Sequence, residues 1–362
     1  MTQIAPGGTI GILGGGQLGR MLALAAANFG YRCHIFCPDK RSPAFQVADQ
    51  VTIADYEDEE ALEEFARKVD VATYEFENVP GVTAELVGRD TLLRPGVRAL
   101  KTTQDRLLEK DFLNASGVKT APYKAFETAD ELQAALKEIG RPSVAKTRRF
   151  GYDGKGQVMI KSRTDLDRVM EVTNGQPAIL EGFVTFDREV SVVVARSASG
   201  DVAAFPVSEN VHTNHILDTT TVPAKISPML EAKAKVMATR VANALEYIGV
   251  MAVEMFVHDS SGEIVVNEIA PRVHNSGHWT IEGANTSQFE QHIRAICDLP
   301  LGSTDARGRV RMKNLLGADI LDFEPYLQDP KAHFHHYGKQ EPRPGRKMGH
   351  VTWLIPTNSR AH

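Results

Sequence analysis

The sequence predicts a protein of several domains that joins a parallel α/β part to an α+β part. The chain has 362 residues, which is more than a single hydrophobic core usually organises. In its N-terminal part, short apolar runs alternate with segments of helical periodicity, which is typical of a parallel sheet covered by helices. The later strand-like runs are β-branched or alternating, and they indicate antiparallel pairs.

The first domain is expected over residues 1–103 as a Rossmann-like parallel α/β domain. Strands and helices alternate in it, and in chain order we expect strand Thr9–Leu13, helix Leu18–Asn28, strand Arg32–Phe36, helix Glu57–Lys68 and strand Val71–Tyr74. The run Arg94-Pro95-Gly96 has the residues of a turn and is expected to lead out of the domain.

A second region is expected over residues 104–302, with a glycine-loop lid subdomain at about residues 115–185 and a mixed or antiparallel sheet after it. Its predicted helices are Gln104–Ser116, Pro228–Leu245 and Ser287–Cys297. Its predicted strands are Ser143–Thr147, Gln157–Ile160, Glu189–Ala195, Gly249–Val257 and Glu263–Ile269. After Pro300 the chain becomes more basic, so residues 303–362 are expected to form a small closing domain.

Composition excludes several classes of protein. The formal charge of −5 gives no general attraction to nucleic acid, and no apolar stretch is long enough to span a bilayer. Residues 1–8 lack the positive charge and apolar core of a secretory signal. Cys33, Cys37 and Cys297 form neither a CxxC pair nor an even disulfide framework, so we expect reduced cysteines and a cytoplasmic protein.

Three glycines follow the first predicted strand in the spacing G-x-G-x-x-G. They are Gly14, Gly16 and Gly19, and Asp39 follows about twenty residues later. Taken alone, this motif is compatible with a nicotinamide-dependent oxidoreductase. The same glycines also suit a packing turn or a site for another phosphate ligand, so the motif by itself leaves the three interpretations open.

A second glycine-rich segment lies between two predicted strands. Lys146 lies on the first strand, and Gly151, Gly154 and Gly156 follow with Asp153 among them. Glycines let backbone amides approach phosphate oxygens, and a lysine adds a fixed positive charge. We therefore interpret the segment as a phosphate-covering loop, with an ordinary hairpin turn as the alternative.

Two acidic residues are expected to face each other on a hairpin. If the turn is centred near residue 261, Glu254 and Glu268 lie directly opposite each other with Cβ atoms about 5 Å apart. Like charges at such a position are destabilising unless a cation lies between them, and paired carboxylates with nucleotide phosphates suit Mg²⁺. The alternative is a carboxyl group of raised pKa or two exposed strand acids.

A polar run leaves the second of these strands and contains Arg272 and His274. Arginine offers a planar fork for a carboxylate or phosphate, and histidine can donate to a charged intermediate. Next to a metal site, both residues are candidates for the reaction itself, although single histidines are often structural.

In its ordered motifs, the chain resembles the ATP-grasp ligases, and among them the 5-(carboxyamino)imidazole ribonucleotide synthases of purine biosynthesis. The motifs extend over nearly the whole chain and are Gly14–Met21, Tyr152–Gln157, Glu181–Val184, Asn267–His278, Tyr337–Lys339 and Arg346–His350. The resemblance implies an ATP-grasp fold and a homodimer. It also implies that ATP and Mg²⁺ convert bicarbonate to carboxyphosphate, which carboxylates aminoimidazole ribonucleotide and leaves ADP and phosphate.

The resemblance also implies roles for residues. The ATP site would consist of Arg106, Lys146, Gly151, Tyr152, Asp153, Gly154, Lys155, Gly156, Gln157, Glu181, Gly182, Phe183, Val184, Glu189, His212, Asn267 and Glu268. Glu254 and Glu268 would bind Mg²⁺, and the catalytic residues would be Asp153, Arg272 and His274. The ribonucleotide would be held by Gln17, Leu18, Glu75, Lys155, Lys339 and Arg346, with Glu77 as an alternative to Glu75.

One position departs from the wider superfamily. Ala270 stands where an asparagine often follows the second metal glutamate, so water is expected in place of a third side-chain ligand. The alternatives from other classes are the oxidoreductase and a nucleotide-binding protein without turnover. Nearer alternatives are other ATP-grasp ligases, such as a formate-using glycinamide ribonucleotide enzyme or a biotin carboxylase.

Overall fold

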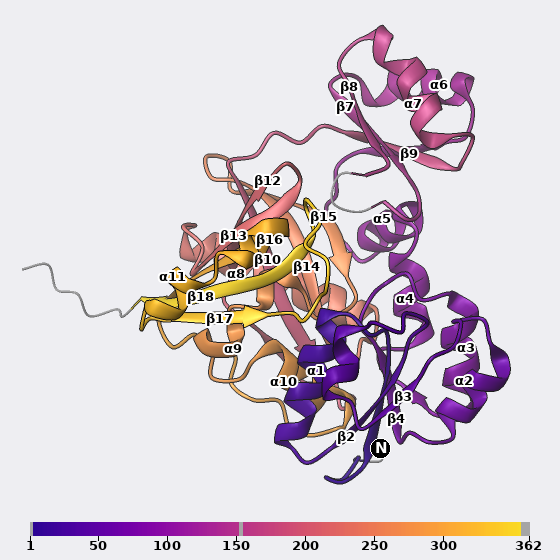
Figure 1. Ribbon diagram of the computed structural model, residues 1–362. Coiled ribbons are helices and arrows are strands. Elements are labelled where there is room, and N and C mark those ends of the chain that lie inside the picture. The colour runs from indigo at the N-terminus through magenta and orange to yellow at the C-terminus, as the bar shows by residue number, and fades with distance from the viewer. Residues whose placement is uncertain (1–2, 152–154, 356–362) are drawn as a thin grey trace, which may run out of the picture.

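The computed structural model of the chain describes residues 3–151 and 155–355, and in these residues the strands form three sheets (Figure 1). The predicted site residues Tyr152, Asp153 and Gly154 lie outside the described part of the chain. Two of the sheets, with five and nine strands, belong to the main body of the molecule. The third has four strands and stands apart from that body together with helices α6 and α7.

The N-terminal sheet has the strand order β3-β2-β1-β4-β5, and all its pairs are parallel, as predicted. Its strands are β1 (Thr9–Leu13), β2 (Arg32–Phe36), β3 (Gln50–Thr52), β4 (Val71–Tyr74) and β5 (Leu92–Leu93). Its helices are α1 (Gln17–Asn28), η1 (Pro43–Val47), α2 (Glu59–Ala66) and α3 (Gly81–Asp90). Helix α2 begins later than predicted because the side chain of Asp58 caps it by accepting the amide of Ala61.

Two helices, α4 (Val97–Thr103) and α5 (Arg106–Ala115), lead to the four-stranded sheet. This sheet has the order β6-β9-β7-β8, and all its pairs are antiparallel. Its strands are β6 (Tyr123–Phe126), β7 (Ser143–Thr147), β8 (Gln157–Ile160) and β9 (Ala178–Gly182). Its helices are α6 (Ala129–Ile139), η2 (Arg163–Asp165) and α7 (Leu166–Thr173). Helices and sheet share a separate hydrophobic core, so this lid subdomain packs as a unit.

The nine-stranded sheet has the order β15-β14-β10-β12-β13-β16-β18-β17, with β11 paired to β10. Its strands are β10 (Arg188–Arg196), β11 (Val202–Ala204), β12 (Ser208–Thr213), β13 (Ile216–Val222), β14 (Gly249–His258), β15 (Glu263–Ala270), β16 (Arg309–Leu316), β17 (Ala332–His336) and β18 (Lys347–Ile355). Its helices are α8 (Pro228–Ala244), η3 (Asn275–Gly277), α9 (Thr280–Gly283), α10 (Gln288–Ile296), η4 (Gly317–Leu321) and α11 (Glu324–Gln328). Since β16 pairs with β13, the C-terminal strands continue the central sheet. The predicted domain bounds 1–103, 104–302 and 303–362 remain a prediction.

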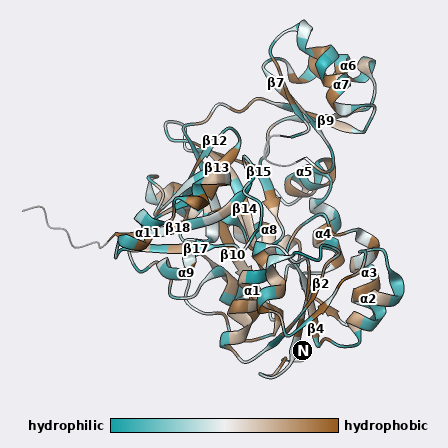
Figure 2. Ribbon diagram, viewed as in Figure 1, coloured by the Kyte–Doolittle hydropathy of each residue, from teal (hydrophilic) through white to brown (hydrophobic). Residues whose placement is uncertain are grey.

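The N-terminal domain and the central sheet share one hydrophobic core. Apolar side chains from β1, α1, α10 and β14 pack together in it, and Figure 2 shows hydrophobic residues along the strands and on α1. Polar contacts add to this packing, because Thr73 Oγ1 lies 2.9 Å from His292 Nε2 and Arg94 donates to the carbonyl of Ile296 at 2.7 Å. Among the described helices, none is both long and apolar enough to cross a bilayer.

Candidate active site

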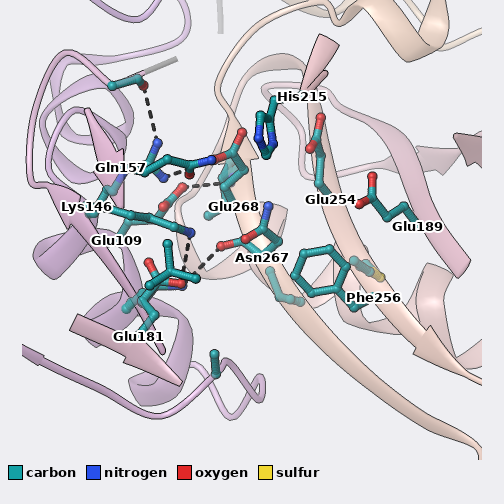
Figure 3. A pocket seen from close by; sticks show the side chains of 18 of the residues that line it. Glu109, Lys146, Gln157, Glu181, Glu189, His215, Glu254, Phe256, Asn267 and Glu268 are labelled. Atoms are coloured by element: carbon teal, nitrogen blue, oxygen red, sulfur yellow. Dashed lines mark hydrogen bonds and ion pairs between the residues drawn. The ribbon is translucent and has the colours of Figure 1, made fainter. Parts of the chain in front are cut away.

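A cleft of about 700 Å³ lies between the lid subdomain, helix α5 and the edge of the central sheet at β14 and β15 (Figure 3). It brings together most of the predicted site residues: Arg106, Lys146, Gly151, Lys155, Gln157, Glu181, Gly182, Phe183, Val184, Glu189, His212, Glu254, Asn267, Glu268, Arg272 and His274. The predicted residues Gln17, Leu18, Glu75, Gly156, Lys339 and Arg346 are not part of its lining. The cleft therefore contains most of the described residues expected around a nucleotide, with Gly156 as an exception. Of the residues expected around the ribonucleotide, it contains Lys155.

Glu254 and Glu268 are paired directly across β14 and β15, as the hairpin argument predicted. Each carboxylate has a nitrogen partner: His274 Nε2 lies 3.0 Å from Glu254, and Arg106 Nη1 lies 3.1 Å from Glu268. Burial opposes ionisation of Glu254, but His274 and His212 outweigh it and hold its pKa below the usual value of a glutamate. Glu254 is therefore an ionised carboxylate at neutral pH, as a metal ligand must be.

His274 is backed by a chain of buried polar groups. Its Nδ1 accepts from the backbone amide of Ser276 at 3.3 Å, so the proton of a neutral ring lies on Nε2, which faces Glu254. The Ser276 hydroxyl lies 2.8 Å from Nδ1 and 2.7 Å from the hydroxyl of Ser191, which accepts from the amide of Asn210 at 2.9 Å. These contacts fix the orientation of the imidazole relative to the carboxylate.

Glu181 sits between two lysines at the inner end of β9. Its Oε2 lies 3.1 Å from both Lys110 Nζ and Lys146 Nζ. Burial opposes its ionisation, yet the two lysines lower the pKa of Glu181 to about 2. Its other oxygen, Oε1, is buried and has no hydrogen-bond partner among the described residues. A buried acceptor without a donor is costly, so this oxygen suits a ligand with an N–H group.

Arg272 forms a fork with Glu77. Its Nε and Nη2 each contact an oxygen of that carboxylate, the latter at 3.1 Å. Burial disfavours the ionised acid, but Arg272 lowers the pKa of Glu77 to about 2. Because Glu77 also lines the cleft, the pair links the N-terminal domain to the site.

Glu75, the other acid considered for the substrate, lies at the N-terminus of α1. Its carboxylate accepts from the amide of Gly16 and, at 2.6 Å, from that of Gly19. The helix amides that a dinucleotide phosphate would use are therefore occupied by a side chain of the protein itself. A Cβ at Gly14 would lie 2.3 Å from Glu75 Cγ, so the glycines allow this acid to approach the helix closely.

A second group of polar residues gathers around Glu75. Lys339 donates to the carbonyl of Lys347 at 2.8 Å, and Lys347 lines the cleft. Burial and the charge of Arg346 lower the pKa of Lys339 to about 8, and Glu75 acts in the opposite direction. Gln17 and Leu18 begin helix α1 between the two glycines whose amides bind Glu75, so these three predicted substrate residues lie close together.

Sequence reasoning missed several residues of the cleft. Glu109 and Lys110 project from α5, and Phe186 stacks on Phe256 with ring centroids 4.5 Å apart. His215 also lines the cleft, from a turn with positive φ (Figure 3). For Glu109 and Lys110 a signal was available, because residues three and four positions after Arg106 lie on the same face of a helix. The other contacts depend on the packing of distant strands.

The chain is similar to known protein families along nearly its whole length. Residues 111–289 match the ATP-grasp domain, residues 8–104 the ribonucleotide synthetase preATP-grasp domain, and residues 311–362 the phosphoribosylaminoimidazole carboxylase C-terminal domain. It is 50% identical to the N5-carboxyaminoimidazole ribonucleotide synthase of Brucella melitensis, over 98% of each chain. It is 43% identical to the Bacillus subtilis enzyme of the same name, over 97% of this chain and 92% of that one.

Solved structures of N5-carboxyaminoimidazole ribonucleotide synthases are also similar to this chain. An ADP complex of an N5-carboxyaminoimidazole ribonucleotide synthetase is similar at a TM-score of 0.95 and 45% identity, covering 98% of this chain and 94% of the other. The Aspergillus clavatus enzyme in complex with ADP and 5-aminoimidazole ribonucleotide is similar at a TM-score of 0.90 and 32% identity, covering 97% and 94%.

Proposed function

Because the chain belongs to the N5-carboxyaminoimidazole ribonucleotide synthases, a family of ATP-grasp ligases, we infer that it carboxylates 5-aminoimidazole ribonucleotide at the expense of ATP in purine biosynthesis. In this reaction bicarbonate is activated as carboxyphosphate, and the carboxyl group passes to the amine of the ribonucleotide with release of ADP and phosphate. The observation that carries the assignment is the nucleotide cleft with its paired carboxylates, joined through Lys347 to the separate basic group around Lys339.

The nucleotide is proposed to bind between the lid subdomain and β15. Lys146 supplies positive charge to the phosphates, and Arg106 lies near the same end of the cleft, 3.1 Å from Glu268. The open oxygen of Glu181 suits an amino group such as that of adenine, and residues 182–184 continue along the same edge. Glu189, whose carboxylate contacts His212, is proposed to hold the ribose.

Glu254 and Glu268 are proposed to hold Mg²⁺ together with the phosphates. The donor set fits this ion, because two carboxylates face each other. Ala270 has no side-chain oxygen, so water is proposed as the further ligand. Among the residues that the structure describes, no group of three or more His, Cys, Asp or Glu side chains could hold a metal alone, which agrees with a site completed by the nucleotide. When bound, the ion would neutralise charge on the transferring phosphoryl group.

Arg272 and His274 are proposed to stabilise the activated carboxylate. Arg272 is already oriented by Glu77, and the proton on His274 Nε2 points toward the metal end of the cleft. Asp153, outside the described residues, is proposed to receive the proton of the substrate amine. Lys155, Lys339 and Arg346 are proposed to bind the phosphate of the ribonucleotide. Gln17, Leu18 and Glu75 are proposed to contact the ribonucleotide from the N-terminal domain.

The test is the release of ADP, measured with and without 5-aminoimidazole ribonucleotide and with and without bicarbonate. We expect full turnover only when both are present. ADP release that is independent of both would contradict this function, and a requirement for formate or biotin instead would favour another ATP-grasp ligase. Titration with NADH adds a check, since tight binding would support the oxidoreductase interpretation of the front glycines.

We also propose that the protein acts as a homodimer in the cytoplasm. Both statements rest on the family, and the three cysteines, which are buried and free, suit a reducing compartment. Light scattering of the purified protein would test the dimer, and a mass equal to one chain would contradict it.

A further inference from the structure

One turn of helix α5 contacts three consecutive residues of β15. The side chain of Lys110 donates to the carbonyl of Asn267 at 3.3 Å, and Arg106 contacts the carboxylate of Glu268 at 3.1 Å. Glu109 Oε1 accepts from the backbone amide of Ile269 at 2.7 Å. Helical spacing places these three side chains on one face, so a single rigid element holds the strand before, at and after Glu268.

The two outer contacts of this turn are buried. Glu109 is 3% and Lys110 1% exposed, and Lys110 also pairs with Glu181 of β9. Lys110 therefore links the lid sheet to the central sheet. A buried lysine with two acceptors and a buried carboxyl group with a backbone donor are costly to disturb, because each partner left behind would lose its hydrogen bond.

The same helix is fixed to the lid subdomain at its first residue. Arg148, which follows β7, makes a bidentate contact with the N-cap residue Asp105, with distances of 2.7 to 3.1 Å. The backbone amide of Arg106 donates to the carbonyl of Arg148 at 2.9 Å. Helix α5 is thus attached to the lid at one end and to β15 along one face.

We propose that Glu109 and Lys110 are positioning residues that hold the 267–269 segment of β15, and with it the Glu268 carboxylate, in the place where Glu268 and Glu254 share the divalent ion. The inference deepens the proposed function, since it rests on Glu268 as a metal ligand. Neither residue binds the ion: both act through the backbone on either side of a ligand. Figure 3 shows Glu109 beside Glu268, at the end of the cleft where Lys146 enters.

The contact made by Glu109 agrees with a positioning role. Its Oε1 accepts from the backbone amide of Ile269 at 2.7 Å, so Glu109 acts on the strand through one acceptor oxygen. A glutamine at this position keeps the same acceptor, whereas an alanine removes it.

The experiment compares Glu109→Gln, Glu109→Ala and Lys110→Met with the wild type. Binding of Mn²⁺ in the presence of ADP is followed by electron paramagnetic resonance, and the Mg²⁺ dependence of turnover is measured in parallel. Outer-shell partners of metal ligands typically contribute at least tenfold to affinity. We therefore expect Glu109→Ala and Lys110→Met to weaken Mn²⁺ binding by about tenfold, and Glu109→Gln by less than about twofold.

Lys119→Met is the matched control. Lys119 pairs with Glu263 at the outer end of β15, where the lysine is 66% exposed, so its loss should leave Mn²⁺ binding unchanged. Glu268→Gln distinguishes a failure of the proposed metal site from a failure of the positioning role. If Glu268→Gln binds Mn²⁺ like the wild type, the metal site itself is wrong. If it loses Mn²⁺ but Glu109→Ala does not, only the positioning role is overturned. Should Lys110→Met fail to fold, the pair of Glu109 variants decides alone.

Discussion

Glu254 and Glu268 lie opposite each other on β14 and β15, and the regular pairing of the two strands breaks directly after Glu254. Two carboxylates at such a position repel each other, and each has its own nitrogen partner, His274 for Glu254 and Arg106 for Glu268. The arrangement keeps two carboxylates close in a form that a divalent ion can use. Because each acid has its own partner, the role of each can be tested by a single substitution.

Glu268→Gln should abolish turnover while the fold is kept. Glutamine preserves the shape of the side chain but removes the charge that the proposed metal requires. The measurement is ADP release at saturating substrates, with thermal unfolding followed by circular dichroism. Glu263→Gln, on the same strand but at its exposed end beside Lys119, is the control and should retain full activity. Full activity in Glu268→Gln would remove this carboxylate from the reaction.

The opposition of Glu254 and Glu268 could be predicted because it depends on local information. Two alternating runs and a turn-rich segment determine the register of a hairpin, and the period of a strand determines which side chains share a face. The parallel N-terminal sheet was predictable for a similar reason, since its strands follow one another with helices between them.

The contacts that were missed join residues distant in the sequence. Glu109 meets Ile269 across 160 positions, and Glu75 reaches the amides of α1 across 59 and 56. Nothing near Glu75 in the sequence indicates that its carboxylate will occupy a helix N-terminus. Likewise, the pairing of β13 with β16 joins the C-terminal strands to the central sheet over a long connection, which no local pattern specifies.

Gly16→Ala should destabilise the protein and impair the ribonucleotide site. Gly16 caps α1 in an extended conformation, and an added Cβ would lie 2.6 Å from Glu75 Oε1. The carboxylate must then move away from the helix amides, and we expect a loss of about 2 kcal/mol for the buried hydrogen bonds. Urea unfolding measures this loss, and the KM for 5-aminoimidazole ribonucleotide should rise.

Gly96→Ala is a closely matched control for that substitution. Gly96 also caps a helix, α4, in an extended conformation, but an added Cβ there meets no atom within 4 Å. Any general effect of alanine at an N-cap is common to both variants. Equal stability losses in the two would show that the proximity of Glu75 to Gly16 has no energetic consequence.

Arg272→Lys should lower kcat with little change in stability. Lysine keeps the charge but cannot contact both oxygens of Glu77, so the remaining cation is no longer held in one orientation. Loss of an oriented donor to a reacting group typically lowers kcat by about 100-fold. Arg240→Lys is the control: Arg240 is a surface arginine that donates to the carbonyl of Gly117, and its replacement should leave kcat unchanged. A reduced affinity for ATP with unchanged kcat would instead assign Arg272 to the nucleotide.

His292 should make the stability of the protein fall in mild acid. Its Nδ1 accepts from the backbone amide of Val250 at 3.0 Å, so the ring proton lies on Nε2 and is directed to Thr73 Oγ1. Burial lowers the pKa of His292 to about 3 from its usual 6.5. Between these values the unfolded chain binds a proton that the folded protein does not. The contribution of His292 to stability is therefore complete above pH 6.5 and is lost as the pH falls toward 3.

The measurement is the free energy of unfolding of the wild type and of His292→Gln at pH 7.5 and pH 5.5. Glutamine does not titrate, so the variant lacks this loss, and other titrating groups contribute equally to both proteins. The wild type should be the more stable at pH 7.5, and its advantage should shrink by about 1.4 kcal/mol at pH 5.5. An advantage that stays constant would mean that His292 takes up a proton in the folded state. In that case the bond from Val250 would be broken, and with it one of the polar contacts that hold α10 between the N-terminal domain and the central sheet.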